Sequence, residues 1–142
     1  MPRMTAQELE TFIAAQFPGG NAFSQVEEVG DDWVRLRLPF SDAYLRPGGT
    51  VSGPTLMTLA DTAAYVLILA MLGPVALAVT TNLNINFMRR PTPDAMIAKA
   101  RMLKLGRQLA VVEVMIEAAA TGTLVAQSTA TYSLPPRGAA QT

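Results

Sequence analysis

Asp61 is the residue best placed for chemistry, because it is the only formal charge in the apolar stretch from Pro54 to Leu72. An ionised carboxylate is costly to remove from water, and Asp is almost never fully buried without a partner. Residues three and four apart share one stripe of a helix. The polar stripe here consists of Thr55, Thr58, Asp61, Thr62 and Tyr65. The sequence therefore predicts a mostly buried helix that carries one carboxylate.

Three hypotheses explain this carboxylate. In the first, the polar stripe faces a solvated boundary between packed elements or a structural partner. In the second, the stretch crosses a membrane, for which roughly 20 apolar residues suffice, although Asp61 lies at its centre and no Lys/Arg cluster flanks it. In the third, Asp61 acts as a catalytic acid or base in an apolar cleft, where restricted solvation changes its reactivity. We favour the third hypothesis.

Composition narrows the chemistry that is available. The chain has no His and no Cys, which excludes Ser-His-Asp and Cys-His catalysis, a His general base, and metal sites built from these ligands. Carboxylates, hydroxyls, backbone N–H groups and Arg/Lys remain. The 11 basic and 11 acidic residues cancel, which argues against a nucleic-acid or membrane-surface partner. We expect no metal and no cofactor.

The overall composition indicates one domain that buries part of its surface against another subunit. The 142 residues suffice for a single core. Half of them are hydrophobic and only 15% are charged, a surplus that favours a subunit interface. The N-terminal MPRMTAQELETF has no apolar run, so we expect no signal peptide and a cytoplasmic protein.

The chain before the central helix predicts one helix and a strand pair. Thr5 and Glu8 form a capping box, and we expect an N-terminal helix within residues 1–20, ended by Pro18-Gly19-Gly20. Alternation over 24–40 predicts a hairpin or a bent strand pair, and 41–50 reads as loop. Gly53 is expected as the N-cap of the central helix, with Pro54 as its first residue.

The chain after the central helix predicts an antiparallel sheet. Gly73-Pro74 ends the helix, and strands are expected over about 76–88, 95–105, 108–119 and 123–134, followed by a flexible tail at 135–142. The short turns between these strands imply antiparallel neighbours. The fold class is therefore α+β: one domain over 1–142, in which a curved antiparallel sheet of five to six strands wraps one long helix.

The stretches LRPGGTVSGPTLMTLADTA and VTTNLNINFMRRPTPDAMIAKARMLKLGRQLAVVEVMI carry a resemblance to a known family. The LAD motif in the helix, the strand that ends in F-x-R-x-P and the K-x-G-[RK] turn occur together in order. In these features the chain resembles the hotdog-fold acyl-CoA thioesterases of the phenylacetic-acid-degradation type, over about Ala43 to Ser133.

The resemblance implies hydrolysis of acyl-CoA thioesters without a metal or an organic cofactor. It implies a homodimer or homotetramer whose active site lies at the dimer interface. Asp61 would act as general base or nucleophile, and the Gly53 N–H would polarise the thioester carbonyl. Thr80, with Thr81 as a fallback, would place the water. CoA phosphates would meet the cations Arg89, Arg90, Lys104 and Arg107, and the substrate would contact Arg46, Ser52, Thr58, Tyr65 and Asn82.

The loop before the helix departs from that family's pattern, which reads roughly N-P-x-G-x-x-H-G-G. Here Arg46 replaces the Asn, Ser52 the His and Pro54 the second Gly. Arg46 could bind a substrate carboxylate or phosphate, or pair with an acid of the partner. Ser52 can donate one hydrogen bond but cannot act as an acid or base near neutrality. A second hypothesis is therefore a hotdog dimer that binds or senses acyl-CoA without hydrolysing it. A hotdog dehydratase or hydratase is a weaker third, because those enzymes combine a His with an acid.

Overall fold

A computed structural model describes residues 1–16, 23–75 and 77–136. The elements follow the chain in the order α1 (Ala6–Gln16), β1 (Gln25–Val29), β2 (Trp33–Leu38), the 3₁₀ turn η1 (Asp42–Tyr44), β3 (Leu45–Arg46), β4 (Thr50–Val51), α2 (Gly53–Leu72), β5 (Val79–Phe87), β6 (Met96–Leu105), β7 (Leu109–Ala118) and β8 (Leu124–Ser133).

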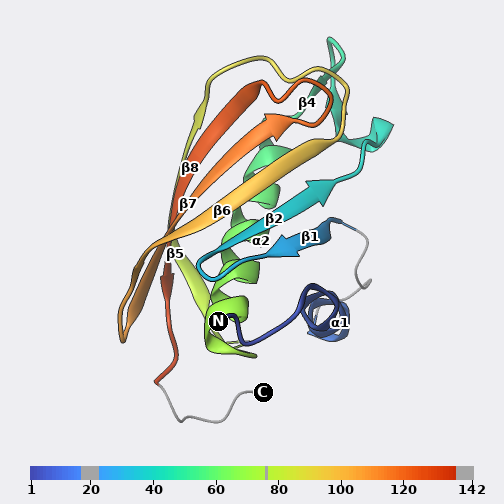
Figure 1. Cartoon of the computed structure of the whole chain (residues 1–142). Coiled ribbons are helices and arrows are strands. Elements are labelled where there is room, and N and C mark those ends of the chain that lie inside the picture. The colour runs from blue at the N-terminus through green and yellow to red at the C-terminus, as the bar shows by residue number, and fades with distance from the viewer. Residues whose placement is uncertain (17–22, 76, 137–142) are drawn as a thin grey trace.

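Six strands form one antiparallel sheet in the order β1-β2-β6-β7-β8-β5, and β3 and β4 form a separate small hairpin. The sheet curves around α2, while α1 lies to one side against β1 (Figure 1). This is the α+β hotdog architecture that the sequence predicts. Of the hairpin and the bent strand pair expected over 24–40, the structure has the hairpin, because β1 pairs antiparallel with β2.

The central helix is apolar nearly all round because the sheet encloses it. Eleven of its residues are buried, among them Leu59 and Leu67, and they face the inward side chains of β6, β7 and β8. Within the described part of the chain, α2 alone is long and apolar enough to span a membrane. Its burial against the sheet is that of a core helix, which the sheet and not lipid covers.

Two local expectations were wrong. The N-cap of α2 is Ser52 and not Gly53, because the Ser52 hydroxyl accepts a hydrogen bond from the N–H of Thr55, at 3.3 Å. Gly53 is instead the first helical residue. The segment 41–50 is more ordered than a plain loop, since it contains η1 and the β3–β4 hairpin, which two positive-φ glycines, Gly48 and Gly49, allow to turn.

The N-terminal capping box is confirmed. The Thr5 N–H donates to Glu8 Oε1 at 2.8 Å, and the Glu8 N–H donates to Thr5 Oγ1 at 3.1 Å. The expected stop of this helix at 18–20 lies outside the described residues, as does 137–142 of the expected tail. The first long strand begins at Val79, later than the expected residue 76.

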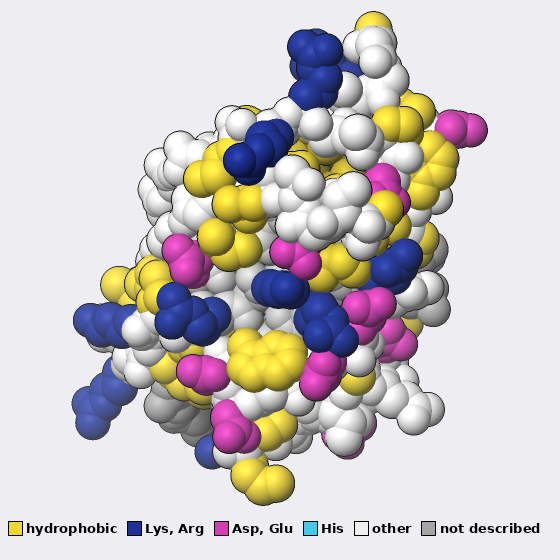
Figure 2. Space-filling model, turned by 45° about the horizontal axis from the view of Figure 1, so that its top comes forward, with side chains coloured by type: hydrophobic (Ala, Val, Ile, Leu, Met, Phe, Trp, Pro, Cys, Tyr) yellow, Lys and Arg dark blue, Asp and Glu magenta, His cyan; other side chains and the backbone are white. Residues whose placement is uncertain are grey.

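The outer face of the sheet carries charged side chains, and most of them form ion pairs with one another. Arg35 bonds to both Glu27 and Glu28, Lys99 pairs with Glu117, and Arg101 pairs with Glu113. Figure 2 shows Lys/Arg and Asp/Glu side chains interspersed over one face of the molecule. Exposed pairs of this kind contribute little stability, so the core around α2 carries most of it.

Leu67→Ala should therefore destabilise the fold by about 2–5 kcal/mol, because it removes fully buried apolar surface and leaves a cavity. Leu103→Ala is the matched control, since Leu103 is 49% exposed on β6 and should cost about 1 kcal/mol or less. Urea unfolding at one fixed protein concentration measures both variants. Equal losses in the two would contradict the assignment of α2 as the core.

Candidate active site

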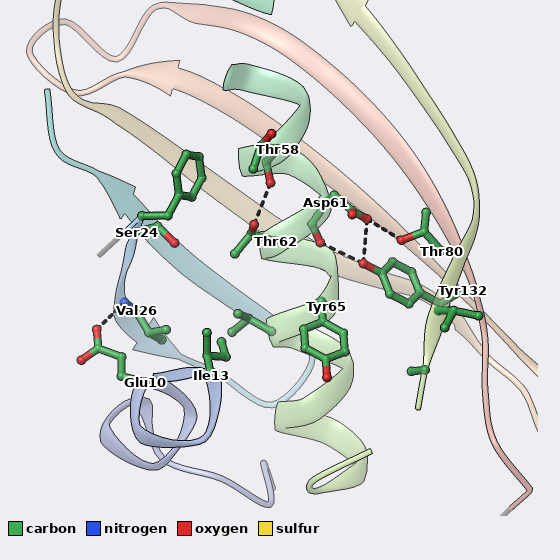
Figure 3. Close-up of a pocket in the computed structure, with 14 residues that line it drawn as sticks. Glu10, Ile13, Ser24, Val26, Thr58, Asp61, Thr62, Tyr65, Thr80 and Tyr132 are labelled. Carbon is green, nitrogen blue, oxygen red and sulfur yellow. Dashed lines mark hydrogen bonds between the residues drawn. The ribbon is translucent and has the colours of Figure 1, made fainter. Parts of the chain in front are cut away.

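A cavity of about 710 Å³ lies between two groups of elements. Ile13 of α1 and Val26 of β1 line one side, and residues of α2, β5 and β8 line the other, as Figure 3 shows. Its size falls in the range of small-molecule sites. Most of its lining is apolar, and Asp61 lies on its wall. This is the apolar cleft that the favoured hypothesis for Asp61 requires.

One oxygen of the Asp61 carboxylate accepts two hydrogen bonds. Thr80 Oγ1 donates to Oδ1 at 2.7 Å, and the Tyr132 hydroxyl donates to the same Oδ1 at 2.6 Å (Figure 3). The Tyr132 hydroxyl also lies 3.1 Å from the main-chain oxygen of Asp61. Among the described residues, none donates a hydrogen bond to Oδ2 and no Lys or Arg forms an ion pair with Asp61. Oδ2 is thus the oxygen whose lone pairs can meet a water.

The two donors reach Asp61 because the sheet places them side by side. Thr80 and Tyr132 are opposite each other in the β5–β8 register, next to an irregularity between Thr80 and Asn82. Tyr65 lies one helical turn after Asp61 on α2, and its ring stacks on that of Tyr132, with ring centres 6.1 Å apart. Burial, and next the hydrogen bond to the Asp61 carboxylate, raise the pKa of Tyr132, so that its hydroxyl stays protonated. Burial also raises the pKa of Tyr65.

The cavity also includes Thr58 and Tyr65, two of the residues expected to contact substrate. The Thr58 hydroxyl donates to the main-chain oxygen of Pro54, at 3.0 Å. Thr81, the fallback for Thr80, donates instead to the main-chain oxygen of Thr131, at 3.2 Å. Of the two adjacent threonines, Thr80 is therefore the one at the carboxylate.

The start of α2 lies away from Asp61 within one chain. Gly53 precedes Asp61 by eight residues, which is about 12 Å along a helix. Its N–H is one of those left without an intrahelical partner at a helix start, where the positive end of the dipole lies. Ser52 caps this end and shares a 2.7 Å hydrogen bond with Thr55 Oγ1. The ring of Phe87, at the end of β5, would lie 3.4 Å from a Cβ on Gly53.

The remaining expected site residues do not line the cavity. Arg46 is exposed on β3, where it pairs with Thr50. Asn82 is exposed on β5, opposite Thr131.

The four cations expected at CoA divide between the two ends of the sheet. Arg89 and Arg90 follow β5, and Arg89 Nη1 donates to the main-chain oxygen of Leu124, at 2.8 Å. Lys104 and Arg107 lie at the opposite end, where β6 turns into β7. A single protomer therefore does not bring all four together.

The sequence interpretation missed Tyr132. The signal was present in the alternation of the last strand, where Ser128, Ala130 and Tyr132 share the inward face. A tyrosine on a buried face needs a hydrogen-bond partner for its hydroxyl. An unpaired carboxylate on the enclosed helix was the natural candidate for that partner.

Comparison with known proteins identifies the class of this fold and site. The chain belongs to the Thioesterase superfamily, whose family model matches residues 48–125. No curated protein matches the chain. A candidate thioesterase from Silicibacter sp. has 39% identity and a TM-score of 0.88, with 96% of this chain and 95% of that chain covered.

Two further solved structures are similar to this chain. A candidate thioesterase from Ralstonia eutropha, related to phenylacetic acid degradation, has 28% identity and a TM-score of 0.73, over 80% of this chain and 86% of that one. Zebrafish thioesterase superfamily member 2 has the same fold, with 24% identity and a TM-score of 0.81. The match covers 93% of this chain and 99% of that chain. The family match and the relative with 39% identity support thioester hydrolysis as the general activity of the chain.

Ser52→Ala should lower the free energy of unfolding by about 1 kcal/mol, because the first turn of α2 loses its side-chain cap. Ser52→Asn should retain most of the stability, since Asn caps helices equally well. Thermal or urea unfolding of both variants makes the comparison. An unchanged Ser52→Ala variant would show that the hydroxyl does not cap α2.

Proposed function

We propose that this protein hydrolyses an acyl-CoA thioester to the free acid and CoA, with Asp61 as the general base. The observation that carries the proposal is the Asp61 carboxylate on the wall of an apolar cavity, with two donors on Oδ1 and none of the described residues on Oδ2. The cavity would hold the acyl group. Its apolar lining favours a hydrocarbon or aryl acyl chain over a polar one.

The chemistry balances with one water and no cofactor. Oδ2 takes a proton from the water as the water oxygen bonds to the thioester carbonyl carbon. The carbonyl oxygen becomes an oxyanion, which the main-chain N–H of Gly53 stabilises at the positive end of α2. The C–S bond then breaks, and the proton held by Asp61 passes to the departing CoA sulfur.

This scheme needs two chains. Because Asp61 and Gly53 are about 12 Å apart along one helix, they cannot act on the same carbonyl group. We propose a homodimer in which the partner subunit's Gly53 supplies the N–H for the carbonyl at Asp61. The same pairing would repeat on the other side, giving two sites per dimer. Two dimers could associate further into a tetramer.

The edge strand β5 is suited to form this dimer. It has nine residues, and its exposed side chains include Val79 at 55% and Phe87 at 52%. The backbone N–H and C=O groups along an exposed edge of this length are a template for pairing with another chain. At the opposite edge, the N–H of Val26 is already bonded to the Glu10 carboxylate, at 2.7 Å, so β1 is less available.

The arrangement of β5 fits the two-chain site. Thr80, beside Asp61, begins the strand, and Phe87, beside Gly53, ends it. Antiparallel pairing of two β5 strands around a twofold axis near Asn84 sets the Thr80 end against the partner's Phe87 end. It would also bring the partner's Arg89 and Arg90 to the end of the sheet that carries Lys104 and Arg107, where they could contact CoA phosphates.

A second function is favoured by one observation at the start of α2. Ser52 stands where the family pattern has His, and its hydroxyl is engaged with Thr55. A chain with this loop could bind or sense acyl-CoA without hydrolysing it. For either function we propose a cytoplasmic location, with no nucleic acid or membrane as partner.

The test of the proposed function is thiol release from a panel of acyl-CoAs, from short aliphatic to long-chain and aryl esters. Asp61→Asn should keep the fold but lower turnover by about 10²-fold or more, as expected for the loss of a general base. Turnover within a few-fold of the unchanged protein would contradict the role of Asp61. Stabilisation by CoA esters without any turnover would select the binding function.

The dimer is tested by cross-linking, because the chain has no Cys of its own. Asn84→Cys should form an intermolecular disulfide on oxidation, since residues facing each other across an antiparallel pair have Cα atoms at disulfide-compatible distances. Glu28→Cys, on the opposite edge strand β1, is the control and should stay uncross-linked. A cross-link in the control alone would place the interface at the other edge.

A further inference from the structure

We infer that Tyr132 is a positioning residue for the reaction: its hydroxyl holds Oδ1 of Asp61 so that Oδ2 faces the water. This inference rests on the proposed function. The observation behind it is the 2.6 Å hydrogen bond from the Tyr132 hydroxyl to Oδ1, which is shorter than its 3.1 Å approach to the main-chain oxygen of Asp61.

The carboxylate of an Asp can rotate about its last side-chain bond, and both oxygens are then equivalent toward a water. Two donors on a single oxygen remove that equivalence. Thr80 comes from β5 and Tyr132 from β8, so the carboxylate is tied to two strands while its main chain belongs to α2. Hydrogen bonds to a charged group are stronger than those between neutral groups.

Tyr132 is itself firmly held. Only 3% of it is exposed, and its ring stacks on Tyr65 at an interplanar angle of 23°. Its position opposite Thr80 in the β5–β8 register is set by the main chain. Because it stays protonated, it acts as a donor and not as a competing base. Thr80, in contrast, is exposed on the edge strand, so Tyr132 is the more rigid of the two donors.

The alternative is that Tyr132 merely fills the core. Its ring would then matter and its hydroxyl would not. Phe keeps the ring, the stacking on Tyr65 and the burial, and it removes only the donor. Tyr132→Phe therefore separates positioning from packing.

The experiment compares Tyr132→Phe with the unchanged protein on the best acyl-CoA of the panel. We expect kcat to fall by about 10- to 100-fold, because a misplaced catalytic group costs rate, while KM changes less than about threefold. Tyr44→Phe is the same chemical change on η1, at a residue that does not line the cavity, and it keeps the ring that packs against Phe23. This variant is the control and should keep its kcat. Thermal melts of all variants check that each is folded at the assay temperature.

A double variant links the effect to the carboxylate. If Tyr132 acts through Asp61, adding Tyr132→Phe to Asp61→Asn should lower turnover no further, so that the two losses do not multiply. Multiplying losses, or an unchanged kcat in Tyr132→Phe, would overturn the inference while an Asp61-dependent activity left the proposed function standing. No turnover in the unchanged protein would overturn both.

Discussion

The structure depends on a single constraint: an apolar helix enclosed by a sheet carries one carboxylate that must find partners. An uncompensated charge at Asp61 would oppose the burial of α2. Two hydroxyls of the sheet donate hydrogen bonds to this charge, from Thr80 on β5 and Tyr132 on β8. Both bonds end on Oδ1, so the arrangement that makes the charge tolerable in the fold also leaves Oδ2 for chemistry.

The same helix sets the need for a second chain. Its N-terminus offers unpaired N–H groups and a positive dipole end, but Gly53 lies about two turns before Asp61 and cannot share a substrate carbonyl with it. The edge strand β5 runs alongside both positions, from Thr80 to Phe87. A twofold axis through this strand would therefore align the base of one subunit with the oxyanion donor of the other.

Much of the fold could be predicted from the sequence, because its signals are local. Capping at Thr5 and Glu8, alternation in the strands and the apolar run of α2 each follow from nearby residues. The family resemblance predicted Thr80 as the hydroxyl that places the water, but its hydrogen bond to Asp61 was found only in the structure. Tyr132 was missed because it lies 71 residues from Asp61, and only the β5–β8 register brings it there. The N-cap was misplaced by one residue, since Gly53 before Pro54 and Ser52 both suit a helix start.

Activation of a water by Oδ2 of Asp61 can be followed in a single turnover in ¹⁸O-labelled water, with enzyme in excess over acyl-CoA. Mass spectrometry then locates the label in the released acid and in the peptide that contains Asp61. General-base catalysis predicts the label in the acid and none in Asp61. Label in the carboxylate of Asp61 would show that Asp61 attacks the thioester itself, and would rule out its role as the general base.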